Sequence, residues 1–137
     1  MHELRTYYNL SEANELVPRL EYLFSELARI QERVNTLSRT AKRSSDFSTL
    51  HADERVRTLS EEYLRRLHEI GELGVVVEDA DHGIVRFYSW FGGEEICLSW
   101  QYGEPEVRHW HCVTEPAAAR RSLVQLQKNL KKHRRLH

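Results

Sequence analysis

Residues 74–113, GVVVEDADHGIVRFYSWFGGEEICLSWQYGEPEVRHWHCV, decide the fold that this sequence predicts. Glycine-containing turns separate four short segments rich in β-branched and aromatic residues, at 75–77, 84–90, 95–101 and 107–113. Because the connections are short, neighbouring segments should run antiparallel. The stretch therefore predicts a small β-meander sheet with one face packed on helices.

Two amphipathic stripes precede this sheet. Large apolar residues recur every three or four positions over residues 16–37 and again over residues 56–70. The polar segment 39–53 keeps no such period and reads as the loop between the two helices. These patterns predict a long antiparallel helical hairpin.

The start of the first helix has two alternative interpretations. Asn9 and Glu12 have the spacing of a capping box, which predicts a start near residue 10. Pro18 lies about two turns further on, where it should kink the helix or move its start close to residue 17.

The remaining segment completes a single α+β domain over residues 1–137. Apolar residues after Pro116 predict a third helix that ends in the basic run KNLKKHRRLH. The expected parts are a helical hairpin at 1–73, a small antiparallel sheet at 74–114, and a C-terminal helix with a basic tail at 115–137.

Composition limits the environment and the partners. With 20 Lys and Arg against 21 Asp and Glu, the whole-molecule charge favours neither nucleic acid nor an anionic membrane surface. The basic tail could contact phosphates, but no base-reading motif accompanies it, so we expect neither a nucleic-acid nor a membrane partner. Two cysteines without a signal-like N-terminal stretch indicate a cytoplasmic protein.

The HWH sequence carries the main chemical hypothesis. In a strand, His109 and His111 share one face, so their imidazoles could bind one divalent metal such as zinc. The candidate ligands are His109, His111, Glu104 and Glu106, with Asp79 and Asp81 as further carboxylates in neighbouring turns. The alternative is that one histidine is hydrogen-bonded within the sheet and the other is exposed.

Aromatic residues around this corner leave three functions open. They could form only the core, or they could wall a small-ligand pocket with Glu104, Arg108 and His111 at its rim. Glu104 and His111 could also form the acid–base pair of a small hydrolase, although no nucleophile motif accompanies them. A purely structural or protein-interaction module is the remaining alternative, so whether the protein is an enzyme stays open.

Several short motifs occur along the chain: the opening NLSEANELVP at 9–18, GV at 74–75, GIVRF at 83–87, LSW at 98–100, GEPE at 103–106 and WH at 110–111. Together they resemble the landmarks of an uncharacterised bacterial family, domain of unknown function 2203. The resemblance covers roughly residues 7 to 123. Ser99 stands where the family has a cysteine, and 117–121 replace a glycine-rich AGR stretch. The resemblance implies no activity.

The leading hypothesis is a cytoplasmic binding protein that takes a metal or small ligand at the GEPE/HWH corner. The two helical stripes carry more apolar length than one small sheet can cover, so we also expect a homo-oligomer that buries part of the hairpin.

Overall fold

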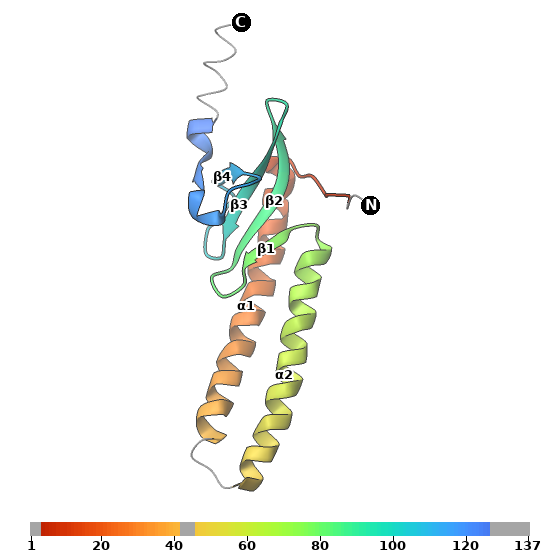
Figure 1. The fold of residues 1–137 in the computed structure, drawn as a ribbon, viewed down its shortest axis with the longest axis vertical. Helices are drawn as coiled ribbons and strands as arrows, with labels where there is room; N and C mark the ends of the chain where they lie inside the picture. The colour runs from red at the N-terminus through yellow and green to blue at the C-terminus, as the bar shows by residue number, and fades with distance from the viewer. Residues whose placement is uncertain (1–3, 42–45, 127–137) are drawn as a thin grey trace, which may run out of the picture.

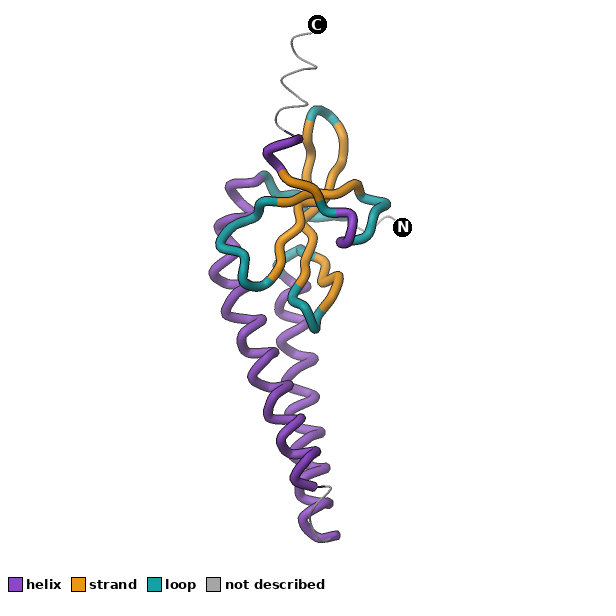
Figure 2. Tube along the Cα trace, turned by 90° about the vertical axis from the view of Figure 1, so that its left-hand side faces the viewer, coloured by secondary structure: helices purple, strands orange, loops and turns teal. Residues whose placement is uncertain are grey.

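A computed structural model describes residues 4–41 and 46–126 of the chain. Helices α1 (Leu10–Ala41) and α2 (Asp46–Glu72) lie side by side as an antiparallel hairpin, as Figure 1 shows. A five-stranded sheet packs beside the part of α1 near its N-terminus, and the other half of the hairpin extends beyond the sheet (Figures 1 and 2). The α+β architecture predicted from the sequence is confirmed.

The capping box sets the start of α1. The backbone N–H of Asn9 donates to Glu12 Oε1 at 2.9 Å, and the N–H of Glu12 donates to Asn9 Oδ1 at 2.8 Å. The helix begins at Leu10 and includes Pro18, so the alternative start near residue 17 is wrong. Reciprocal satisfaction of two first-turn amides stabilises a start ahead of the proline.

The connection between the helices is much shorter than predicted. Helix α1 continues to Ala41 and α2 begins at Asp46, so most of the predicted loop at 39–53 is helical. Within the predicted loop, the hydroxyl of Thr40 donates to the carbonyl of Thr36 at 2.9 Å, and Thr36 and Thr58 on either side make the same bond to the carbonyl four residues earlier. Such residues weaken the apolar period without interrupting the helix.

The sheet is a meander in the order β1-β2-β3-β4-β5, with every neighbouring pair antiparallel. Its strands are β1 (Val76–Asp79), β2 (Ile84–Phe91), β3 (Glu94–Gln101), β4 (His109–Cys112) and β5 (Arg121–Ser122). The first four match the predicted segments, and β5 was not predicted.

The predicted C-terminal helix is present but begins later than Pro116. The segment after β4 forms a short 3₁₀ turn, η1 (Ala117–Ala119), and then β5, which pairs with His109 and Trp110 of β4. Helical residues begin only at 123. Pairing with the edge of β4 fixes this backbone as a strand, which an apolar period cannot reveal. The basic run at 128–135 lies outside the described residues.

The core lies between the hairpin and one face of the sheet. Its largest fully buried members include Leu20 and Leu23 of α1, Phe87 of β2 and Trp100 of β3. Each such side chain contributes about 1.5–3 kcal/mol on burial. The apolar stripes therefore pack largely within the chain. In the described part of the chain, neither long helix is apolar enough to cross a bilayer.

Candidate functional site

The sheet face turned away from α1 is polar. Arg86 of β2 lies opposite Ser99 of β3, which lies opposite His109 of β4, while Cys97 lies opposite His111. Directly opposed residues share a face, so the prediction that His109 and His111 point the same way is confirmed. We call the following set the polar face: Glu78, Arg86, Cys97, Ser99, His109 and His111.

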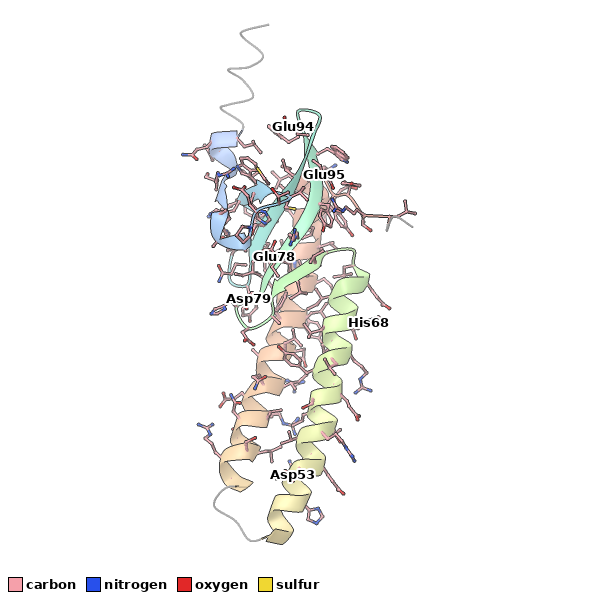
Figure 3. All side chains as sticks on the ribbon, in the orientation of Figure 1. Asp53, His68, Glu78, Asp79, Glu94 and Glu95 are labelled. Carbon is pink, nitrogen blue, oxygen red and sulfur yellow. The ribbon has the colours of Figure 1, made fainter. Side chains whose placement is uncertain are left out.

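His111 is completely buried and both of its ring nitrogens face oxygen acceptors. Its Nε2 lies 3.0 Å from Glu78 Oε1, and its Nδ1 lies 2.7 Å from the carbonyl oxygen of Cys112. Glu78 belongs to β1, so this contact spans the sheet from its first strand to its fourth. Figure 3 labels Glu78 on the sheet, next to Asp79. The imidazole therefore ties strands together and has no nitrogen directed at an open position.

Arg86 joins the same pair. Its Nε lies 3.0 Å from Glu78 Oε1 in an ion pair, and its Nη1 donates to the carbonyl of Val113 at 3.3 Å. Only 8% of the Glu78 side chain is exposed, so water screens its charge little and its interactions with neighbouring charges are strong. Arg86 provides the compensating charge.

Cys97 is fully buried on this face, and its surroundings disfavour the reactive thiolate. Burial raises the pKa of its thiol, and a hydrogen bond with Arg86 only partly opposes that shift. A buried, protonated thiol is a poor nucleophile. Cys97 therefore supports no covalent chemistry here.

Glu104 fixes the predicted GEPE turn and binds Arg120. Its Oε1 accepts the backbone N–H of Gln101 at 2.6 Å, and its carbonyl accepts Trp100 Nε1 at 3.0 Å. The Nη2 of Arg120 lies 2.6 Å from both carboxylate oxygens. The ring nitrogen Nδ1 of His109 lies 3.1 Å from Glu104 Oε2.

The surroundings of His109 favour the neutral form of its imidazole. Burial lowers the pKa of its imidazole, the positive charge of Arg120 lowers it further, and Glu104 opposes both. The Arg120 guanidinium contacts His109 Nδ1 directly. A cation thus already occupies the position between the imidazole and the carboxylate.

The structure separates the predicted ligand set into pairs. Glu104 lies beside His109, His111 beside Glu78, and the exposed Glu106 beside Arg108, with Nε–Oε1 at 3.0 Å. The predicted acid–base pair of Glu104 and His111 is therefore not formed. Within residues 4–41 and 46–126, no group of three or more His, Cys, Asp or Glu side chains could hold a metal ion.

Sequence reasoning missed the residues that complete these pairs. Glu78 reaches His111 only because the register slips between Val77 and Asp79. Arg120 lies in the stretch where the resembled family has AGR, which was the one available signal. The hydroxyl of Ser99 is fully buried and, among the described residues, has no hydrogen-bond partner.

A cavity of about 250 Å³ opens on the helix side of the turn that follows β3. Aromatic side chains from three segments contribute to its lining: Phe24 of α1, Tyr63 of α2 and Tyr102 of the turn. Polar residues of α1 and of the β1–β2 turn complete it, including Gln31, Glu32, Asn35, Asp81 and His82. This cavity is not the predicted pocket, because Glu104, Arg108 and His111 are absent from its lining.

A larger hollow of about 870 Å³ lies beside the N-terminal segment. Leu4, which borders this hollow, is 99% exposed. Two polar side chains of its lining donate to Glu95 Oε1, Arg5 Nη1 at 2.5 Å and the Tyr7 hydroxyl at 2.9 Å. The Arg5 guanidinium also covers the ring of Tyr88 at 4.4 Å. The polar and aromatic side chains at this hollow are thus already bonded to one another. The smaller aromatic cavity is therefore the better candidate for a ligand site.

Comparison with known proteins supports the resemblance seen in the motifs. No curated protein and no solved structure matched the chain. The model of one family, described as an uncharacterized conserved protein (DUF2203), matches residues 6–123. That match includes both helices, all five strands and the GEPE/HWH corner, and the chain therefore belongs to the DUF2203 family.

Proposed function

We propose that this protein is a small-molecule binding protein whose ligand occupies the aromatic cavity under the turn at 101–104. The observation that carries the proposal is the lining, in which Phe24, Tyr63 and Tyr102 bring aromatic rings from three separate segments to one cavity of about 250 Å³. Concave sites with aromatic walls and a few polar groups are the usual form of small-ligand sites. A volume of this size suits a compact ligand of fewer than about ten non-hydrogen atoms.

The walls of this cavity are preformed. The backbone N–H of Tyr102 donates to the carbonyl of Gly83 at 2.8 Å, which joins the two turns. Gly83 has a φ of +68°, and a Cβ there would lie 2.5 Å from the Cβ of Tyr102. Only glycine allows this close approach without strain. On α1, Gln31 Nε2 donates to Asn35 Oδ1 at 3.0 Å, which fixes one polar wall.

One residue of the predicted corner, Tyr102, also lines this cavity. Tyr102 belongs to the WQYGEPE stretch, but its ring packs toward α1, with its centroid 6.4 Å from that of Phe24. Glu104 turns instead to Arg120 and His109 on the other side of the sheet. The turn therefore serves a cavity on one side and an ionic network on the other.

A panel of neutral, anionic and cationic molecules of five to eight non-hydrogen atoms tests the proposal. We expect binding of at least one member to shift the aromatic NMR signals of Phe24, Tyr63 and Tyr102. The variant Tyr63→Leu should weaken that binding at least tenfold, whereas Tyr22→Leu, at an exposed tyrosine of α1 outside the cavity, should not. If no member shifts the cavity resonances, the proposal is wrong.

A divalent metal at the corner is a second candidate, supported by one specific contact. Two ligands of one tetrahedral metal lie slightly more than 3 Å apart, and His109 Nδ1 lies 3.1 Å from Glu104 Oε2. Burial and Arg120 lower the pKa of this imidazole, which favours the neutral form that a metal ligand requires. A metal would have to displace the Arg120 guanidinium, so this candidate is the weaker of the two.

Calorimetric titration of zinc into protein purified without a histidine tag tests the metal candidate. Because Arg120 competes for the cation position, Arg120→Gln should bind zinc more tightly than the wild type, and adding His109→Gln should abolish the gain. Glu106→Gln serves as the control and should change nothing. If neither the wild type nor Arg120→Gln binds zinc more tightly than about millimolar, the corner is not a metal site.

A further inference from the structure

We infer that the ligand of the aromatic cavity is a small organic cation, held by the rings of Phe24, Tyr63 and Tyr102 and by the carboxylate of Asp81. This inference rests on the proposed function and names its ligand class. It follows from the charges around the cavity, from the rings, and from the absence of an ion-pair partner for Asp81 among the described residues.

The charge of the lining is negative. Among the described residues, the lining includes the carboxylates of Asp81 and Glu32 and contains neither lysine nor arginine. His82 also borders the cavity, but its Nδ1 lies 2.8 Å from Asp79 Oδ2, and its backbone N–H donates to Asp79 Oδ1 at 3.0 Å. Glu32 lies 3.5 Å from Arg39 Nη2 in an exposed ion pair, which leaves Asp81 as the carboxylate of the lining without such a partner among the described residues. The imidazole of His82 is directed to a carboxylate outside the lining, so an anionic ligand would meet the negative charge of Asp81.

Asp81 differs from the other carboxylates discussed above. Glu78, Glu95 and Glu104 each lie 3.0 Å or less from an arginine nitrogen. Asp81 is an exposed residue that lines the cavity, and it forms no ion pair with any residue that the structure describes. Its negative charge affects Tyr63, because burial and the neighbouring Asp81 together raise the pKa of that phenol. A free carboxylate beside an aromatic wall is a position that a ligand cation can fill.

The aromatic rings provide the second half of cation recognition. A cation within about 6 Å of the centre of an aromatic ring is attracted by the negative face of its π system, and quaternary ammonium groups are recognised in this way. Phe24, Tyr102 and the buried Trp100 form one cluster, with centroid separations of 6.0 to 6.5 Å. Tyr63 stands on α2, so rings approach the cavity from both helices and the turn. A neutral ligand would use the rings but not Asp81.

Three molecules of nearly identical shape separate these possibilities. Choline carries the positive charge, 3,3-dimethylbutan-1-ol replaces the charged nitrogen with carbon, and 3,3-dimethylbutanoate carries a negative charge. Each has seven or eight non-hydrogen atoms and fits the size expected for the cavity. Titration of each into the full chain, followed by the NMR signals of Tyr63 and Tyr102, measures the preference for charge at constant shape.

We expect choline to bind at least about tenfold more tightly than the alcohol, with the carboxylate weakest of the three. Asp81→Asn should bring choline to within about threefold of the alcohol, while binding of the alcohol stays unchanged. Asp53→Asn is the matched control, because Asp53 is an exposed carboxylate near the far end of the hairpin (Figure 3), and it should retain the full preference. Because the alcohol does not need Asp81, unchanged alcohol binding also shows that the variant cavity is intact.

Other outcomes would overturn the charge of the ligand, the role of the carboxylates, or the binding site itself. Equal affinity for choline and the alcohol would leave a small-molecule site in place but exclude the cation class, and so would a preference for the carboxylate. A tenfold preference for choline that survives in both Asp81→Asn and Glu32→Gln would remove the carboxylates from the inference. Failure of these three molecules and of the whole panel described above would overturn the proposed function together with its ligand class.

Discussion

Replacing Glu78 with alanine should destabilise the fold more than any other single carboxylate change discussed here. The substitution removes the oxygen shared by His111 and Arg86 at 3.0 Å each. Breaking a buried ion pair by removing one partner costs about 3–5 kcal/mol, because the other partner stays buried and uncompensated. Since 23% of the Arg86 side chain is exposed and can regain water, we expect a loss of about 2–3 kcal/mol in the free energy of unfolding.

Urea unfolding followed by circular dichroism measures this loss. With a slope of about 1–3 kcal/mol per molar urea, a loss of about 2 kcal/mol lowers the midpoint by roughly 1 M. Glu78→Gln keeps the size of the side chain and one acceptor oxygen, so it should lose less than Glu78→Ala and separate charge from packing.

Glu106→Ala is the matched control for this experiment. Glu106 pairs with Arg108 at the same distance of 3.0 Å, but both side chains are more than half exposed. Exposed pairs contribute about 0–1 kcal/mol, so the control should remain close to the wild type. If Glu78→Ala lies within about 0.5 kcal/mol of this control, the polar face is not the buried ionic network inferred from the contacts.

Two further predictions concern assembly and pH. Self-association through the hairpin was predicted from its apolar stripes, and in the described part of α1 and α2 the exposed large apolar side chains are Tyr22 and Leu64. Light scattering should therefore show a dimer or larger species that Leu64→Glu dissociates, and a monodisperse monomer at micromolar concentration would contradict this. The lowered pKa of His109 means that the unfolded chain binds a proton more readily than the folded one, so its contribution to stability is complete above about pH 6.5 and falls as the pH decreases below that value. His109→Gln should show a weaker loss of stability between pH 7 and 5, and parallel curves for the two proteins would refute the assignment.

The fold was predictable where one rule governed a segment. Alternation and glycine turns located four strands, and the reciprocal bonds of Asn9 and Glu12 confirm the capping box. The loop predicted at 39–53 is mostly helical because its Ser- and Thr-rich residues lack an apolar period but can still continue a helix, as Thr40 does by bonding back to the carbonyl of Thr36. The strand at 121–122 was not predicted, because it forms only by pairing with the edge of β4, which lies ten or more residues away in the sequence.

The site was predictable only as far as side-chain direction. Strand alternation correctly placed His109 and His111 on one face, but it could not assign their partners. The partner of His111 lies 33 positions earlier in the chain and reaches it across two intervening strands. Long acidic and basic side chains can reach many neighbours in a sheet, so the choice depends on register and on a bulge that leave no mark in local sequence.

The family motifs at this corner hold three segments together: α1, the turn after β3, and the segment that leads into β5. The Oδ1 of Asn14, from the opening motif, accepts the backbone N–H of Val107 at 2.7 Å, which ties α1 to the approach of β4. Glu104 of the GEPE motif ties the turn after β3 to Arg120, close to the start of β5. Each of these polar groups has a defined structural partner, so the polarity of the motifs alone does not indicate a ligand. A group that is polar, lines a cavity and lacks a partner among the described residues is a better guide, and at this end of the sheet Asp81 meets that criterion.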